Sequence, residues 1–180
     1  MPASFRERTR PETSNMLEFR LDHLFDKPTE LLVIGAHSDD IEIGAGGTIR
    51  QLLGSANTLN VQWVVLAAPG ERKIEALRSA RSILGADPKH RIETHDFRDG
   101  FFPYDGARIK ETFEQLKKDA KPDVILTHFR DDLHQDHRLT SELTWNTFRD
   151  HLILEYEIPK YDGGLGSPNV LVPLTADVVA

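Results

Sequence analysis

The feature that most constrains the fold of this chain is the apolar segment 31–36 (LLVIGA), which runs directly into His37, Asp39 and Asp40. A short apolar run without a polar face is typical of a strand that is covered on both sides. Charge at the end of such a strand is costly to bury unless a partner compensates it. The segment therefore predicts a central strand with a polar site at its carboxyl end.

Strand-like and helix-like patterns alternate along the rest of the chain. Apolar runs predict strands at 61–66, 91–97, 123–128 and 169–172, and apolar residues three or four positions apart predict helices at 48–53, 71–84, 107–118 and 139–154. We interpret Gly44, Gly46 and Gly47 as a turn before the first helix. The alternation favours an α/β fold, a Rossmann-like three-layer arrangement with a mostly parallel central sheet and helices on both faces.

Length and composition narrow the class of protein. With 180 residues, 39% of them hydrophobic, we expect one domain over residues 16–180 after a flexible polar arm at 1–15. A net charge of -7 argues against a nucleic-acid partner. Apolar runs stay well short of the roughly 18 residues of a membrane span, and the first 15 residues lack the apolar core of a secretory signal. We therefore expect a cytoplasmic protein without a membrane span.

Two polar clusters follow predicted strands. Residues 37–40 (HSDD) follow the strand at 31–36, and residues 134–137 (HQDH) lie in the loop after the strand at 123–128. Because the carboxyl ends of parallel strands share one edge of a sheet, both clusters should project from that edge. The chain has no cysteine, so any metal must be held by His, Asp or Glu.

The two clusters together contain the residue types that the active site of a zinc hydrolase needs. His37, Asp40 and His137 can supply the three ligands of a catalytic zinc, which leaves a fourth position for water. Asp39 could take the proton from that water. His134 could stabilise the oxyanion and protonate the leaving amine, with Asp136 orienting His134 and raising its pKa. Such a site suits hydrolysis of an amide or ester.

Other interpretations of these residues remain open. A single His at a strand end is often a hydrogen-bonded structural residue, and Asp39 or Asp40 could be a helix cap. A dinucleotide site lacks support because the first loop does not have the G-x-G-x-x-G spacing. Two His and one carboxylate also serve non-haem iron oxygenases, but those usually have all-β folds.

At these residues the sequence resembles the LmbE-like, or PIG-L-type, family of zinc-dependent N-acetylglucosaminyl deacetylases. The family patterns are A-H-P-D-D-x-E, G-x-G-G and H-x-D-H, and here they stand at 36–42, 44–47 and 134–137. The resemblance spans about residues 30–175. It implies the same roles for the metal ligands His37, Asp40 and His137 and for the catalytic residues Asp39, His134 and Asp136.

The resemblance also implies a substrate site. The family's Arg-x-x-Glu pair stands here at Arg72 and Glu75, so Arg72 is expected to hold sugar hydroxyls or a phosphate. Arg98, Asp99 and Arg130 follow the third and fourth predicted strands and are expected to line the same pocket. A solvated helix end for Arg72, and surface salt bridges for the other three, are the competing interpretations.

The sequence departs from the family pattern at three places. Ser38 replaces a proline, Asp132 stands where some members have a tyrosine, and the chain ends at Ala180, earlier than relatives commonly do. We therefore expect a deacetylase domain that is truncated at the C-terminus relative to the family, with part of the substrate wall missing. A homo-oligomer could form through Trp145, Phe148, Leu152 and Ile153, although burial in the core is the other use of these side chains.

The resemblance implies removal of the N-acetyl group from an N-acetylglucosamine-type sugar conjugate, with one Zn²⁺ as cofactor, Fe²⁺ as the other candidate ion, and acetate as product. One alternative is a zinc amidase that acts on a related sugar conjugate. The other is a catalytically silent sugar-binding or assembly subunit.

Overall fold

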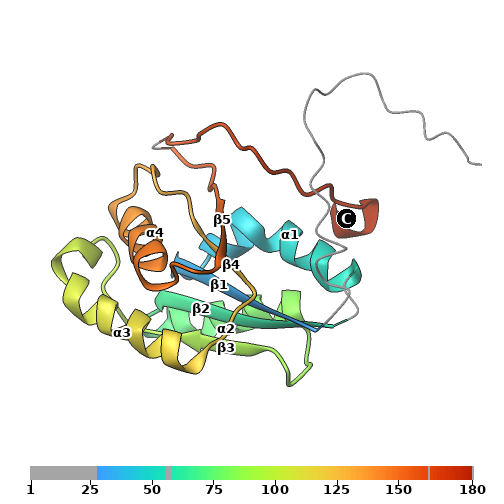
Figure 1. Ribbon diagram of the computed structural model, residues 1–180, viewed down its shortest axis with the longest axis horizontal. Coiled ribbons are helices and arrows are strands. Elements are labelled where there is room, and N and C mark those ends of the chain that lie inside the picture. Colours follow the sequence, from blue (N-terminus) through green and yellow to red (C-terminus); the bar gives the residue numbers. More distant parts are fainter. Residues whose placement is uncertain (1–27, 56–57, 162, 180) are drawn as a thin grey trace, which may run out of the picture.

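Figure 1 shows the computed structural model of the chain, which describes residues 28–55, 58–161 and 163–179. The arm expected at 1–15 lies outside the described residues, as does the start of the domain expected from residue 16. No helix in the described part of the chain is long and apolar enough to cross a membrane.

A five-stranded sheet forms the centre of the molecule, with β1 as its middle strand. The strand order is β3-β2-β1-β4-β5, and every neighbouring pair of strands is parallel. The strands are β1 (Thr29–His37), β2 (Leu59–Ala67), β3 (Arg91–Thr94), β4 (Val124–His128) and β5 (Leu152–Tyr156). The predicted central position of the first strand is confirmed.

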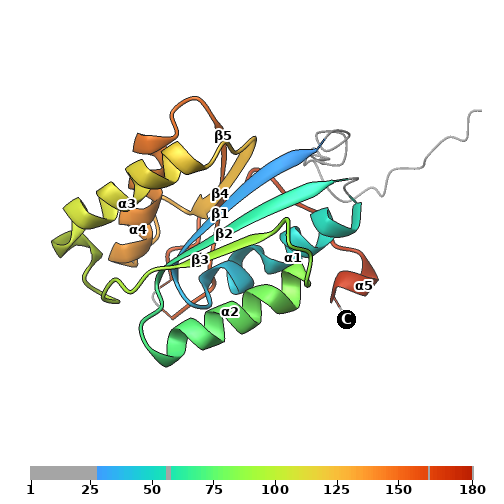
Figure 2. The same cartoon turned by 90° about the horizontal axis from the view of Figure 1, so that it is seen from below.

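Helices cover both faces of this sheet, so the predicted three-layer α/β fold is confirmed (Figure 2). Helices α1 and α2 pack on one face, and α3 and α4 pack on the other. The helices are α1 (Asp40–Ser55), α2 (Glu71–Leu84), α3 (Gly106–Asp119), α4 (Gln135–Thr147) and α5 (Ala176–Val179), with a short 3₁₀ helix, η2 (Phe102–Tyr104), before α3.

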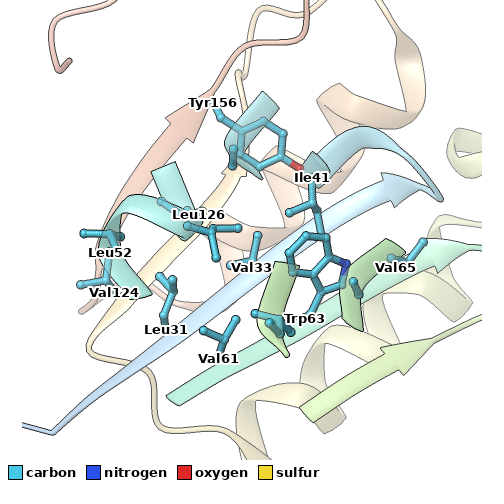
Figure 3. Packing of buried hydrophobic residues seen from close by; sticks show 14 of the residues in the cluster. Leu31, Val33, Ile41, Leu52, Val61, Trp63, Val65, Val124, Leu126 and Tyr156 are labelled. Carbon is cyan, nitrogen blue, oxygen red and sulfur yellow. The ribbon is translucent and has the colours of Figure 1, made fainter. Parts of the chain in front are cut away.

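The core has two halves because successive side chains of a strand point to opposite faces. In β1, Leu31 and Val33 face α1 and α2, whereas Leu32 and Ile34 face α3 and α4. Trp63 of β2 is fully buried in the first half, which Figure 3 shows from close by. A strand apolar on both faces is thus buried on both faces, and His37 at its carboxyl end is partly exposed.

The predicted turn at Gly44, Gly46 and Gly47 is wrong, because these residues lie inside α1, which starts at Asp40. Close packing explains the glycines: a Cβ atom on Gly44 would overlap the ring of Tyr156, and one on Gly47 would lie 2.8 Å from the side chain of Leu174. Glycine disfavours a helix only weakly, and burial of the apolar face of α1 compensates. The helix therefore places Asp40 in its first turn.

The predicted helix at 139–154 is wrong at both ends. Helix α4 starts at Gln135 and ends at Thr147, and the apolar residues from Leu152 onward form β5, which pairs with β4. The strand expected at 169–172 is absent from the described part of the chain, where those residues are irregular. The third strand is also shorter than expected, ending at Thr94. The apolar run 152–154 is compatible with a helix or a strand, and its pairing with β4 makes it a strand.

The four residues considered for an oligomer contact divide into two kinds. Phe148 and Ile153 are buried in the core, whereas Trp145 and Leu152 are 38% and 42% exposed. Core burial therefore accounts for Phe148 and Ile153, and only the other two side chains offer apolar surface.

Candidate active site

The two polar clusters meet at the carboxyl edge of the sheet, between β1 and β4. His37 is the last residue of β1 and Asp40 is the first residue of α1. His134 directly precedes α4, and Asp136 and His137 lie in its first turn. Helix α1 then crosses one face of the sheet and α4 the other (Figure 2). In open parallel sheets, ligands bind at the point where the helices that follow two neighbouring strands go to opposite faces of the sheet.

His37, Asp40 and His137 form a compact cluster of donor atoms. Nδ1 of His37 lies 3.2 Å from Nε2 of His137 and 3.2 Å from Oδ2 of Asp40. Nε2 of His137 lies 3.4 Å from Oδ1 of Asp40. Two ligands that are each about 2.0–2.1 Å from a tetrahedral zinc are about 3.3 Å apart. The three residues therefore have the donor types of zinc ligands, and the two imidazole nitrogens have the spacing of two ligands of one such ion. Each of these nitrogens lies near a different oxygen of Asp40.

The electrostatics of this cluster also favour a cation. Burial lowers the pKa of His37, but contacts with the carboxylates of Asp136 and Asp40 outweigh burial and raise this pKa to about 10. Burial raises the pKa of Asp40, but contacts with His128, His137 and His37 hold it well below its ordinary value. Buried carboxylates that stay ionised create a negative potential, which a metal ion can neutralise.

Each imidazole of the cluster has a carboxylate on its other nitrogen. Nε2 of His37 lies 3.2 Å from Oδ2 of Asp136 and 3.0 Å from Oδ1 of Asp99. Nδ1 of His137 lies 3.0 Å from Oδ2 of Asp132. A carboxylate in this position keeps a proton on the outer nitrogen, so a bound metal would replace the proton on the inner nitrogen.

Asp136 therefore has a different partner from the expected one. Its side chain contacts His37 and accepts hydrogen bonds from the backbone N–H groups of Gly100 (2.6 Å) and Phe102 (3.1 Å). His134 meets Asp136 only through the backbone, because Nδ1 of His134 accepts from the Asp136 N–H at 3.3 Å. The pKa of His134 is lowered, by burial first and then by the charge of His137 and His37, although Asp136 opposes this shift.

His128 is a residue of this site that the sequence reasoning missed. It ends β4, is fully buried, and stacks on the ring of His137 with the ring centroids 4.0 Å apart. Its Nε2 accepts a hydrogen bond from the Ala36 N–H (2.9 Å) and lies 3.3 Å from Oδ2 of Asp40. Burial lowers the pKa of His128 to about 4. Its place at the end of a predicted strand was the signal that could have identified it.

A cavity of about 290 Å³ opens beside the donor cluster. Asp39 is exposed and lines this cavity, and His134 lines it as well. The full set of lining residues is His37, Ser38, Asp39, Ala67, Pro69, Arg72, Asp99 and His134. A ligand in the cavity would thus meet the carboxylate of Asp39, the imidazole of His134 and one member of the donor cluster, His37.

Two of the four expected substrate residues lie at this cavity. Arg72 and Asp99 line it, and Arg72 also pairs with Glu75 at 3.2 Å. Arg98 instead stacks its guanidinium 3.4 Å from the ring centroid of Phe101. Arg130 pairs with Glu155 at 2.7 Å, as expected for a surface salt bridge.

A larger hollow, of about 600 Å³, lies along the outer face of α4 and includes Arg130 and Trp145. It contains none of the residues of the donor cluster. We therefore place the site at the smaller cavity, where the titratable groups converge.

Comparison with known proteins assigns the chain to a protein family. A profile of the GlcNAc-PI de-N-acetylase (PIG-L) family matches residues 32–148, from β1 to the end of α4. The chain belongs to this family.

Three relatives show how far the similarity extends. Diacetylchitobiose deacetylase of Thermococcus kodakarensis is 29% identical over 124 residues, which cover 61% of this chain and 44% of that protein. The structure of the N,N'-diacetylchitobiose deacetylase from Pyrococcus horikoshii has a TM-score of 0.53 and 26% identity, covering 72% of this chain and 52% of that one. A deacetylase involved in the teicoplanin biosynthetic pathway has a TM-score of 0.62 and 15% identity, covering 83% and 77%, and shows likeness of fold alone. The chain spans about half the length of the first two relatives.

Proposed function

We propose that this protein is a metal-dependent hydrolase that removes the N-acetyl group from an N-acetylglucosamine-type sugar conjugate and releases acetate. One observation carries the proposal: Nδ1 of His37 and Nε2 of His137, from residues a hundred positions apart, lie 3.2 Å from each other beside the carboxylate of Asp40. Membership of the de-N-acetylase family and the likeness to diacetylchitobiose deacetylases support the choice of substrate.

The residues that would hold the metal are His37, Asp40 and His137. Nitrogen and oxygen donors without cysteine suit Zn²⁺, and Fe²⁺ is the other candidate because two His and one carboxylate also bind that ion. When bound there, the ion would lower the pKa of a water and polarise a carbonyl oxygen. The fit rests on the 3.2 Å between the two imidazole nitrogens and on the carboxylate of Asp40, whose Oδ2 lies 3.2 Å from His37 and whose Oδ1 lies 3.4 Å from His137.

Asp39 is the general base of the proposed reaction. Its exposed carboxylate lines the cavity next to the donor cluster and can take a proton from the attacking water. The water oxygen bonds to the acetyl carbon, the carbon–nitrogen bond breaks, and the proton passes to the amine as acetate leaves.

His134 is the group that meets the acetyl oxygen. Because its Nδ1 accepts the Asp136 N–H, the proton of the neutral ring lies on Nε2 and can be donated to a carbonyl oxygen as negative charge develops. Its lowered pKa keeps the ring neutral near pH 7, so it can also pass a proton from Asp39 to the leaving amine. We propose that Asp136 holds His37 in place, instead of assisting His134.

The cavity supports a small substrate group. Its volume of about 290 Å³ is at the lower end of the roughly 300–1,000 Å³ of small-molecule sites. One acetamido sugar matches that volume better than a conjugate of several rings does, so we propose that the rest of the conjugate lies outside. Arg72 and Asp99 are the charged groups that can hydrogen-bond the sugar hydroxyls.

Replacing the base tests the reaction. We expect Asp39→Asn to lower kcat for acetate release by about 10²–10⁴-fold, because a positioned general base contributes that much, while zinc binding is unchanged. Asp150→Asn, at an exposed Asp beyond α4, is the matched control. The assay is acetate release from N-acetylglucosamine, diacetylchitobiose and an N-acetylglucosaminyl phosphoinositol. A wild-type rate in Asp39→Asn would rule out this base.

Two rival functions give different results in the same assay. Release of another acid in place of acetate would identify a zinc amidase acting on a related sugar conjugate. Binding of an acetylated sugar by wild-type protein without release of any acid would identify a sugar-binding or assembly subunit. This alternative is retained because the match covers only 44% of the first relative.

We further propose a cytoplasmic protein, from its acidic composition without cysteine. Trp145 and Leu152 are exposed, and we propose them as the contact of any homo-oligomer. Light scattering of the wild-type protein and of Trp145→Ser would test the contact, since only a protein that uses this face would lose mass in the variant.

A further inference from the structure

A buried carboxylate stands behind the second imidazole of the donor cluster. Asp132 is 2% exposed, and each of its oxygens has a partner. Oδ2 lies 3.0 Å from Nδ1 of His137 and 2.5 Å from Nζ of Lys160, and Oδ1 accepts the His134 N–H at 2.7 Å. One side chain thus contacts the residues at 134 and 137 and a lysine from outside that loop.

Lys160 comes from a part of the chain that the family profile does not match. It follows β5, twelve residues beyond the matched range of 32–148, and its side chain is 18% exposed. The segment after it runs along the loop that carries Asp132: Gly164 lies against Leu133, and Gly166 lies against Phe129. The ion pair therefore joins the loop before α4 to the C-terminal segment.

This arrangement solves two physical problems of a metal-binding histidine. An imidazole that binds a metal through Nε2 needs its proton on Nδ1, and a carboxylate at Nδ1 holds that proton and makes Nε2 a stronger donor. A carboxylate buried for that purpose is costly unless a cation offsets its charge. Lys160 is the cation that contacts Asp132.

We propose that Asp132 and Lys160 are positioning residues for His137: Asp132 orients the ring through its contact with Nδ1, and Lys160 holds the Asp132 carboxylate in place through an ion pair. The inference rests on the proposed metal site, although not on the substrate or the reaction. Neither residue lines the cavity that would hold the sugar, so neither is placed to touch the substrate itself.

Zinc affinity tests the proposal without an activity assay. The dissociation constant of Zn²⁺ alone is measured by competition with a chromogenic chelator, for the full chain and its variants. Loss of a group behind a metal ligand typically costs 10–100-fold in affinity. We expect Lys160→Met to weaken binding by about 10-fold and Asp132→Asn by about 10–100-fold, whereas Lys160→Arg should stay within about 3-fold of wild type.

Lys118→Met is the matched control, because Lys118 is an exposed lysine in the last turn of α3 and should leave the affinity unchanged. Thermal unfolding of each metal-free variant shows whether the fold is kept. Lys160→Met is the decisive variant, since its partly exposed side chain can be replaced without opening the core.

The outcomes separate this inference from the proposed function. Wild-type zinc affinity in both Lys160→Met and Asp132→Asn would overturn the positioning role. If the melting temperature of these variants also fell, the ion pair would stabilise the fold without affecting the metal site. The expected loss of affinity in a protein that deacetylates no sugar would support the positioning role and overturn the proposed function. A wild-type protein that binds no zinc would overturn the metal site and this inference together.

Discussion

At the scale of single residues, the donor cluster depends on which nitrogen of each imidazole carries the proton. Asp136 and Asp132 each lie beside the outer nitrogen of a ring, so Nδ1 of His37 and Nε2 of His137 face Asp40. His134 has the opposite arrangement, with Nδ1 occupied by a backbone N–H and Nε2 left to donate. In the proposed function, hydrogen bonds to the second nitrogen thus divide the histidines into two metal ligands, His37 and His137, and one donor to the substrate, His134.

Asp136 gives a prediction at this scale. We expect Asp136→Ala to destabilise the metal-free protein by about 2–4 kcal/mol, because it strips the acceptor from two backbone N–H groups and from a buried imidazole contact. Urea unfolding measures the change. Asp99→Ala is the matched control: Asp99 also lies 3.0 Å from Nε2 of His37, but its side chain is 71% exposed, and we expect its loss to change stability by less than about 0.5 kcal/mol. Equal effects of the two variants would contradict the assignment.

At the scale of elements, α1 provides one residue of the donor cluster and also packs closely against β5 and the C-terminal segment. Its first residue, Asp40, belongs to the donor cluster, and its glycines let the helix approach Tyr156 of β5 and Leu174 of the C-terminal segment. The hydroxyl of Tyr156 in turn donates to the backbone oxygen of Ile34 in β1 (2.8 Å). The glycines that follow the first motif therefore set how closely α1 lies against the sheet that holds His37.

Gly44→Ala tests this packing. A Cβ atom at Gly44 would overlap the buried ring of Tyr156, and overpacking of this kind typically costs about 1–3 kcal/mol. Gly54→Ala lies in the same helix with nothing within 4 Å of the added Cβ atom, so we expect it to be neutral or to stabilise by up to about 1 kcal/mol. Chemical denaturation measures the free energy of unfolding of both variants. A Gly44→Ala variant as stable as Gly54→Ala would contradict the close approach.

Elements with strong periodicity were predictable, and those decided by distant partners were not. The helix at 71–84 and the strand at 61–66 carry their pattern in their own residues, and the structure confirms both. Helix α1 was predicted too short because its glycines suggest a turn, and β5 was missed because the run 152–154 gains strand character only by pairing with β4. At the site, His128 and Lys160 received no role, since their partners Ala36 and Asp132 lie 92 and 28 residues away. Asp132 received no role although His137 is five residues away, because only the folded loop brings the two side chains into contact.

At the scale of the whole molecule, the site is made by the order of the strands. Two strands about ninety residues apart in the chain, β1 and β4, are neighbours in the sheet, so the clusters at their carboxyl ends become one cluster. The C-terminal segment then adds Lys160 behind the loop before α4 and packs Leu174 on α1. We propose that the described residues from 29 to 179 act as one domain around this site.

The measurement that tests this picture most directly is the zinc content per chain, determined by mass spectrometry after zinc loading and removal of free metal. It compares the wild-type protein with His37→Ala and His137→Ala, one variant from each strand end. We expect close to one zinc per wild-type chain and only a small fraction of that in each variant, because both imidazoles hold the same ion. A full equivalent of zinc retained by either variant would contradict a single site shared by β1 and β4.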